Sequence, residues 1–493
     1  MHTIACLPLQ SEPMAPAPQG GNEHQHQHQP VFRVVDTALV APHAPPPPPC
    51  SLPLTFFDVK WLHLPPVENV FFYRLAPDAD AAATLAALRL SLSHALRAFY
   101  PLAGHVRRAP GHRHELHYQP GDAVPFTVAE YAADVDDLAS DHPVKVSAIA
   151  PLVPQLPKGR RVLAAQATLL LGGGSRGRGL AVGVAIHHSA CDGNSAAHFL
   201  RTWAAACAGR EPPPAPVIDR AGLIPDPRGL YDVYLKSLPP AVSRFDDDFE
   251  FATTMPAADA GDDKQKVLAT FTLTPELLQS IKGAVASEAA RRGVASPRCS
   301  SLVATASFIW CCYCRCRARA AAEGERRCYF LFSVDHRARL KPAVPEAYLG
   351  NCLCPAIAAA AEEEVAAGGA GGLFAACAAV AAALEEEVGE GAAERWTGCV
   401  ERVKEAVAKG TLSVAGSTRL RMYDVDFGFG RPAKLDIVSV AKTGAISVAE
   451  SPKSGNGVEV GISLPADAMG RFQDSFADGV ASLLRRDPRP LDR

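Results

Sequence analysis

The stretch Leu180–Gly193, with the sequence LAVGVAIHHSACDG, decides the fold prediction. Its first part, Leu180–Ile186, is a continuous apolar run of strand length, which predicts a buried strand. The pair His187-His188 ends this strand, Asp192-Gly193 predicts a tight turn, and the apolar spacing of Ser195–Ala208 predicts a helix. The ends of such strands hold side chains rigidly in a crevice, and the loops there commonly carry function.

His188 has the surroundings expected of a general base. The N-terminus of the helix predicted from Ser195 disfavours a positive charge nearby, which keeps the imidazole neutral. A neutral imidazole can take the proton from a hydroxyl as that oxygen attacks a thioester carbonyl. However, the chain has 16 histidines, so a pattern such as His188-x-x-x-Asp192 is expected on the order of once by chance. On these residues alone, a buried histidine pair that satisfies backbone groups is an equally good interpretation.

Both halves of the chain mix strand and helix patterns. At 493 residues the chain exceeds the ~250–300 residues at which one hydrophobic core stops growing, so we expect two domains. A proline-rich, aperiodic segment predicts a linker over residues 209–235. We therefore predict an α/β protein with a disordered tail over 1–30 and domains over 31–208 and 236–493. The other expected strands are Val31–Val40, Leu435–Ser439, Ala445–Ala449 and Val458–Leu464, and the expected helices are Ala79–Ala98, Thr274–Glu288, Ser300–Ala318 and, with a surface insertion, Ala358–Gly391.

The composition is that of an ordinary globular protein. Hydrophobic residues make up 48% of the chain and charged residues 20%. The formal net charge of −3 gives no reason to expect nucleic acid or an anionic membrane as a partner. No apolar run approaches the ~20 residues that a membrane span needs, and the first residues lack the basic start and apolar core of a secretory signal. We therefore expect a cytoplasmic protein.

The 14 cysteines are interpreted as structural residues. Several crowd into the apolar, helix-like segment Ser307–Arg319, and free cysteine behaves as a small buried hydrophobe. The pair Cys311-x-x-Cys314 has no second pair at zinc-site spacing and opens no thioredoxin-like unit. The alternating histidines of His24–His28 are read as part of a disordered tail rather than as metal ligands. No metal site is expected.

Two motifs, one in each half of the chain, carry a resemblance to a known family. His188–Gly193 (HSACDG) resembles the HxxxDG signature of the plant BAHD acyltransferases, and Asp426–Gly430 (DFGFG) resembles their DFGWG motif. FYPLAGHV at Phe99–Val106, SVDHRAR at Ser333–Arg339 and YLGNC at Tyr348–Cys352 agree as well. The resemblance covers nearly the whole chain from about Val31 onward.

The resemblance implies a fold similar to chloramphenicol acetyltransferase, with two similar-sized α/β domains and a central channel between them. The acyl-CoA and the acceptor are expected to enter from opposite faces. His188 matches the family's general base. Asp192 matches an aspartate that points away from the substrate and pairs with an arginine, for which Arg337 is the candidate. Losing one partner of a buried ion pair costs several kcal/mol, so Asp192 is expected to support the geometry of the base.

The DFGFG loop is expected to be structural and to support the CoA side. Asp426, Gly428 and Gly430 match the family's motif. Phe429 stands where the family usually has tryptophan; it keeps an apolar ring and loses the indole N–H. We expect this departure to have a modest effect on the loop.

Several segments are similar to one branch of the family, the anthocyanin and flavonoid glycoside acyltransferases, many of which are malonyltransferases. Ser51–Leu64 and Pro65–Tyr73 carry this likeness, and Val414–Ser417 and Gly457–Gly461 agree with it. The branch's YFGNC motif is matched except at Leu349. The likeness implies transfer of a malonyl group from CoA to a sugar hydroxyl of a phenolic glucoside. Acyl-CoA would be a co-substrate, with no bound cofactor, and the protein a monomer.

A malonyl donor needs a cation for its free carboxylate, and arginine suits this task best. Arg201, Arg419 and Arg421 lie in segments that could face the channel, and Ser417 and Arg419 are the candidate substrate-binding residues. Taken singly, each arginine is better explained by an ordinary surface position, at odds of roughly two to one. The choice between a malonyl and a hydroxycinnamoyl donor therefore stays open.

Three other functions fit the sequence less well. Gly173–Gly177 matches the Gly-x-Ser-x-Gly pattern of serine hydrolases, but it lies before a strand rather than between a strand and a helix. A peptide-forming condensation domain shares the His-His-x-x-x-Asp-Gly pattern, although such domains normally lie beside carrier domains. A degenerate acyl-CoA-binding relative would keep the fold and lose turnover, against which His188 and Asp192 argue.

Overall fold

The computed structural model describes most of the chain. The Gly-x-Ser-x-Gly match at Gly173–Gly177 and the alternating histidines of the tail lie outside the described residues. The described residues are 31–109, 113–172, 178–220, 222–246, 248–253, 265–317 and 326–484.

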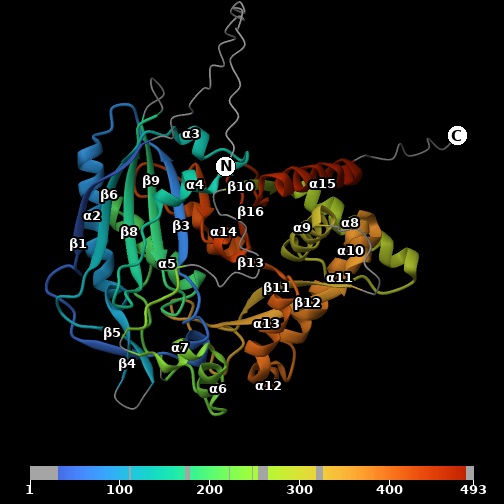
Figure 1. The fold of residues 1–493 in the computed structure, drawn as a ribbon, viewed down its shortest axis with the longest axis horizontal. Helices are drawn as coiled ribbons and strands as arrows, with labels where there is room; N and C mark the ends of the chain where they lie inside the picture. Colours follow the sequence, from blue (N-terminus) through green and yellow to red (C-terminus); the bar gives the residue numbers. More distant parts are fainter. Residues whose placement is uncertain are drawn as a thin grey trace, which may run out of the picture.

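A six-stranded sheet forms the centre of the first half of the molecule, at the left of Figure 1. The helices α2 (Ala81–Ala98) and α5 (Gly193–Cys207) pack against each other, and their apolar residues share one core with the strands. Asp80 caps α2 by accepting hydrogen bonds from the backbone of its first turn. The strands, in sheet order, are β1 (Phe32–Val40), β6 (Val124–Tyr131), β8 (Leu163–Leu170), β9 (Gly179–Ile186), β3 (Val67–Arg74) and β14 (Lys434–Ile437).

A seven-stranded sheet forms the centre of the second half, at the right of Figure 1. The helices α8 (Pro275–Arg292), α9 (Ser301–Arg317), α11 (Gly369–Val388) and α15 (Ala466–Leu484) contribute to its core. The strands, in sheet order, are β12 (Leu353–Ala361), β11 (Arg327–Asp335), β13 (Leu412–Gly416), β15 (Ile446–Glu450), β16 (Val458–Pro465), β10 (Lys266–Leu273) and β7 (Val144–Lys145).

The two halves exchange strands. β14, from the second half, pairs antiparallel with β3 in the first sheet, and β7, from the first half, pairs with β10 in the second. A division of the chain at the 209–235 linker assigns β14 to the second domain and β7 to the first, whereas each strand pairs in the sheet of the opposite domain. The helices α6 (Leu230–Ser237) and α7 (Pro240–Arg244) also join the core of the first half, through Tyr231 and Val242 among others. The halves are therefore tied together by backbone pairing as well as by side chains.

The remaining elements are short. They are β2 (Cys50–Pro53), β4 (His105–Arg108) and β5 (His114–Tyr118), which form a small third sheet, and the helices α1 (Phe56–Val59), α3 (Val135–Leu138), α4 (Val146–Ile149), α10 (Glu362–Ala367), α12 (Ala392–Arg395), α13 (Cys399–Ala408) and α14 (Val440–Thr443).

The elements predicted around the central motif are confirmed, since β9 and α5 occupy the expected strand and helix. The prediction for residues 358–391 is wrong at its start, because residues 358–361 end strand β12 and helices begin only at Glu362. Alanine-rich sequence does not by itself exclude a strand: here every second side chain packs into the core, as alternation requires.

One described helix, α11, is long and apolar enough to cross a membrane, judged by length and composition alone. The expectation that no run reaches this length is therefore wrong. In the structure α11 contacts β12, α8 and α9, and Leu373 and Val380 lie in the second core. These contacts are those of a core helix, so α11 is weak evidence for a membrane partner.

Candidate active site

The candidate base lies between the end of one strand and the start of one helix. β9 ends at Ile186, and the backbone N–H of His187 donates to the carbonyl of Val162. Asp192 caps α5 by accepting a hydrogen bond from the Ser195 backbone at 3.1 Å. Both ends of the loop that carries His188 are thus anchored in regular structure, and the side chain of His188 is half-buried.

The side-chain amide of Asn351 fixes which nitrogen of His188 carries the proton. Asn351 Nδ2 donates to Asp58 Oδ1 and to the backbone carbonyl of His188, both at 2.8 Å. Because both of these oxygens can only accept, the amide nitrogen must face them and Oδ1 must face the ring. Asn351 Oδ1 lies 2.9 Å from His188 Nδ1, so Nδ1 carries the hydrogen. Nε2 is left as the ring's acceptor.

Burial keeps this imidazole neutral. His188 stacks on Trp61, with ring centroids 3.8 Å apart and planes 13° from parallel. Burial is the main cause that lowers the pKa of His188, and the charge of Asp192 and the hydrogen bond that His188 donates to Asn351 only partly oppose it. The predicted neutrality is therefore found, although desolvation rather than the helix N-terminus is its leading cause.

His187 is the buried histidine of the pair, and both of its ring nitrogens have hydrogen-bond partners. Its Nε2 lies 3.1 Å from the carbonyl of Leu64, which can only accept, so Nε2 donates and Nδ1 accepts from the hydroxyl of Ser189 at 2.7 Å. It stacks on Phe251 at 3.5 Å, and burial lowers its pKa to about 3. The two interpretations of the sequence thus apply to different residues: His187 is fully used by the fold, whereas His188 keeps one ring nitrogen as an acceptor.

Asp192 and Arg337 form a buried, bidentate ion pair. The two guanidinium nitrogens lie 2.7 Å and 3.0 Å from the two carboxylate oxygens, and both side chains are almost fully buried. The backbone N–H of Cys352 also donates to Asp192, at 3.1 Å. All of these contacts hold the loop after His188 against the second half of the chain. The carboxylate of Asp192 is therefore occupied by structural partners.

A second buried ion pair, Asp58 and Arg220, holds the segment that carries Asn351. Arg220 is fully buried; it contacts Asp58 Oδ2 at 3.2 Å and donates to the carbonyls of Ala190 and Leu349. Asp58 also closes a capping box with Thr55. The sequence did not assign a role to Asp58, Trp61, Arg220 or Asn351. The Thr-x-x-Asp pattern inside an apolar run was a usable signal for Asp58, whereas Arg220 in the linker gave none.

The DFGFG loop lies at the opposite end of α5. Asp426 Oδ1 accepts from the backbone of Gly428 at 2.8 Å and of Gly430 at 2.9 Å, and both glycines have positive φ (105° and 98°). Phe429 packs edge-on against Tyr73, with centroids 4.9 Å apart. The 15 residues of α5 rise about 22 Å. A Cβ at Gly428 would lie 3.2 Å from Ala208, just beyond that helix.

The candidate substrate-binding residues lie in and beside the short helix η6 (Thr418–Leu420), which contacts α5. Ser417 begins this helix, where its hydroxyl accepts from the Arg419 backbone at 3.3 Å. The Arg419 side chain is exposed, and Arg421 pairs with Asp424 at 3.0 Å. Arg201 reaches across from α5 to the carbonyl of Leu420 at 2.7 Å. The structure thus gathers these segments beside α5 without bringing any of the three arginines into hydrogen-bonding contact with His188.

Comparison with known proteins assigns the family. A family model described as the transferase family matches residues 33–478. The chain belongs to the BAHD acyltransferases. It is 31% identical over 453 residues to the malonyl-CoA:anthocyanidin 5-O-glucoside-6''-O-malonyltransferase of Arabidopsis thaliana, covering 87% of this chain and 94% of the relative. It is 32% identical over 475 residues to phenolic glucoside malonyltransferase 1 of the same plant, covering 91% and 98%.

Solved structures agree on the BAHD fold. Vinorine synthase superposes with a TM-score of 0.64 at 22% identity, over 90% of this chain and 96% of that one. TRI101 of F. graminearum, complexed with ethyl coenzyme A, gives a TM-score of 0.60 at 17% identity, over 86% and 97%. The predicted fold class is confirmed, and the chain is an acyl-CoA-dependent acyltransferase with acyl-CoA as a co-substrate. The hydrolase reading is set aside.

Proposed function

We propose that this enzyme moves an acyl group from CoA to a sugar hydroxyl of a flavonoid, an anthocyanin or another phenolic glucoside, with His188 as the general base. The observation that carries the proposal is the fixed tautomer of His188, whose Nδ1–H is bound to Asn351 Oδ1 at 2.9 Å. Because Nδ1 is occupied, Nε2 is free to accept a proton. The named relatives act on anthocyanidin glucosides and phenolic glucosides.

The reaction follows from this arrangement in two proton transfers. Nε2 of His188 takes the proton of the sugar hydroxyl as the oxygen attacks the thioester carbonyl. When the tetrahedral intermediate collapses, the carbon–sulfur bond breaks and the imidazolium returns the proton to the departing CoA thiolate. Asp192 holds the loop through Arg337 and relays no proton, because its oxygens are already bound. The DFGFG loop supports the CoA side from the far end of α5.

We propose malonyl-CoA as the donor. Two malonyltransferases at 31% and 32% identity support this choice. A coumaroyl donor is the second candidate, because a coumaroyl-CoA:anthocyanidin 3-O-glucoside-6''-O-coumaroyltransferase of Arabidopsis thaliana is 29% identical over 91% of this chain. For the malonyl carboxylate we retain Ser417 and Arg419 as candidate contacts, since the segment that carries them lies beside α5.

A donor competition tests the proposal. The purified protein is incubated with a flavonoid glucoside and equal amounts of malonyl-, acetyl- and coumaroyl-CoA, and the products are identified by mass. A dominant malonyl ester is the expected result, whereas a dominant coumaroyl ester would replace the donor and keep the reaction. His188→Ala is the control; it is expected to lower kcat about 10²–10⁴-fold, the usual contribution of a general base. Near-normal turnover in a folded His188→Ala variant would remove the general-base role.

We also propose that the protein acts as a monomer in the cytoplasm. The cysteines of the described residues are all free, which suits a reducing compartment. The network around His188 is assembled from a single chain. Light scattering after size-exclusion chromatography and a fluorescent fusion in plant cells test these two points; a stable dimer or a membrane-bound signal would contradict them.

A further inference from the structure

A buried group of three potential metal ligands lies outside the site described above. His336, Cys354 and Glu387 each offer a donor atom, and among the described residues these atoms lie within 4.8 Å of one another. His336 follows β11, Cys354 belongs to β12 and Glu387 lies near the end of α11. All three side chains are buried. Nitrogen, sulfur and oxygen donors from three separate elements thus converge on one point.

The contact between His336 and Glu387 is not an ordinary hydrogen bond. His336 Nε2 lies 3.2 Å from Glu387 Oε1, yet this buried nitrogen has no hydrogen-bond partner. The atoms are close enough, but they are not aligned as an N–H···O bond requires. Two ligands of a tetrahedral zinc ion, bound at about 2.0–2.1 Å, are separated by about 3.3 Å. The observed 3.2 Å separation is therefore compatible with two ligands of one tetrahedral ion, and the poor alignment argues against a donor and its acceptor.

We propose that His336, Cys354 and Glu387 bind a Zn²⁺ ion. Imidazole and thiolate ligands bind zinc in preference to magnesium or calcium, and a carboxylate can act as the third ligand. Binding releases the proton of the Cys354 thiol. The ion supplies the partner that His336 Nε2 lacks, and it balances the carboxylate of Glu387 in a buried environment where an unpaired charge would be costly.

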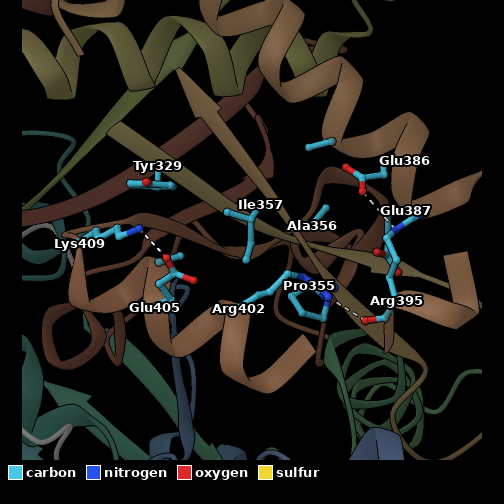
Figure 2. Close-up of a pocket in the computed structure, with 12 residues that line it drawn as sticks. Tyr329, Pro355, Ala356, Ile357, Glu386, Glu387, Arg395, Arg402, Glu405 and Lys409 are labelled. Carbon is cyan, nitrogen blue, oxygen red and sulfur yellow. Dashed lines mark hydrogen bonds and ion pairs between the residues drawn. The ribbon is translucent and has the colours of Figure 1, made fainter. Parts of the chain in front are cut away.

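The surroundings of the group fit a metal site. Trp396 Nε1 donates to Glu387 Oε1 at 2.9 Å, which orients the carboxylate as an outer partner would. Glu387 also lines a cavity of about 250 Å³, together with Ile357, Glu386 and Arg395. Figure 2 shows these side chains around the opening, with Glu386 paired to Arg395. Of the three proposed ligands, Glu387 is the one that lines this cavity.

The proposed ion would brace the active site without taking part in the chemistry. His336 immediately precedes Arg337, and its backbone N–H donates to the carbonyl of Cys352 at 2.8 Å. Cys354 lies three residues after Asn351. Zinc would therefore pin the two segments that hold Asp192 and orient His188. This inference does not depend on the donor or the acceptor of the reaction.

Metal binding to the purified full-length chain tests the proposal. Metal-free protein is titrated with Zn²⁺ against a coloured chelator, and a Co²⁺ derivative is examined for a thiolate-to-cobalt charge-transfer band. We expect about one tightly bound ion per chain, with a thiolate band. Cys354→Ala is expected to lose both. Cys352→Ala, which removes a second buried thiol two residues away, is the matched control and is expected to keep both.

Glu387→Gln separates loss of metal from loss of fold. The amide oxygen of glutamine can still accept from Trp396, so the variant is expected to fold, while its affinity for Zn²⁺ falls at least about 100-fold. Equal metal content in wild type, Cys354→Ala and Cys352→Ala would overturn the proposal and indicate binding to other thiols. Binding without a thiolate band, or unchanged affinity in Glu387→Gln, would overturn it as well.

Discussion

Replacing Asn351 with alanine is expected to slow acyl transfer while the protein stays folded. The amide oxygen of Asn351 accepts the Nδ1–H of His188 at 2.9 Å. Alanine removes this acceptor, so the ring can carry its proton on Nε2, the nitrogen that must be free in a general base. The backbone N–H of residue 351 still donates to Asp58, at 2.9 Å in the native protein, so the segment keeps its main anchor.

The magnitude follows from the role of such supporting groups. Losing the partner that orients a metal-bound histidine typically costs 10–100-fold, and we take the same range for His188, which corresponds to about 1.4–2.7 kcal/mol of activation free energy. The hydrogen bond also acts to raise the pKa of His188, against the larger effect of burial, which lowers it. Removing the bond therefore lowers this pKa further. Since the base acts only when neutral, the acidic limb of the kcat/KM profile should move to lower pH.

Steady-state kinetics across a range of pH provide the assay. Asn194→Ala is the matched control, because it also removes a side-chain amide that reaches the second half, from Nδ2 to the Glu346 carbonyl at 2.9 Å. We expect unchanged KM values in both variants and a reduced kcat only in Asn351→Ala. Wild-type kcat/KM with an unmoved acidic limb would refute the tautomer argument. A fall in kcat without any movement of the limb would reduce Asn351 to a purely structural residue.

Three further variants test the roles assigned around the site. Asp192→Ala should cost about 3–5 kcal/mol of unfolding free energy, because it leaves Arg337 as an unpaired buried charge; an unchanged urea midpoint would contradict this. His187→Asn should cost about 1–3 kcal/mol, since it disturbs buried hydrogen bonds, but a shifted acidic limb in this variant would show that His187 shares the role of the base. Phe429→Trp, which restores the usual family residue, should change stability by at most about 1 kcal/mol, and a larger shift in melting temperature would show that the loop depends on this ring.

The sequence predicted those parts of the fold that depend on local pattern. The apolar run ending at Ile186 and the helix that follows were predicted closely because periodicity and length decide them. The strand at residues 358–361 was not, because short alanine-rich sequence suits a helix equally well and only packing against the second core decides. The exchange of β7 and β14 had no signal. β7 has only two residues, and the pattern that predicted a strand at Leu435–Ser439 does not say which sheet that strand joins.

The site was predicted only where residues are neighbours in sequence. His188 and Asp192 belong to one motif, and Arg337 entered through the family resemblance. Asn351, Trp61 and Arg220 were missed because their contacts with His188 and Asp58 join segments that are far apart in sequence. An asparagine in a loop or an arginine in a linker has no periodicity that could distinguish it from a surface residue.

These long-range contacts make the base a property of the assembled molecule. His188 follows a strand of the first sheet, whereas Asn351 lies two residues before the edge strand β12 of the second. The tautomer of the imidazole is therefore correct only when the two halves are docked in register. The strand exchange serves that requirement, because β14 and β7 pair across the halves through backbone hydrogen bonds. A hinge between freely moving domains would let Nδ1 lose its acceptor, and the base would then have to be ordered anew in each turnover.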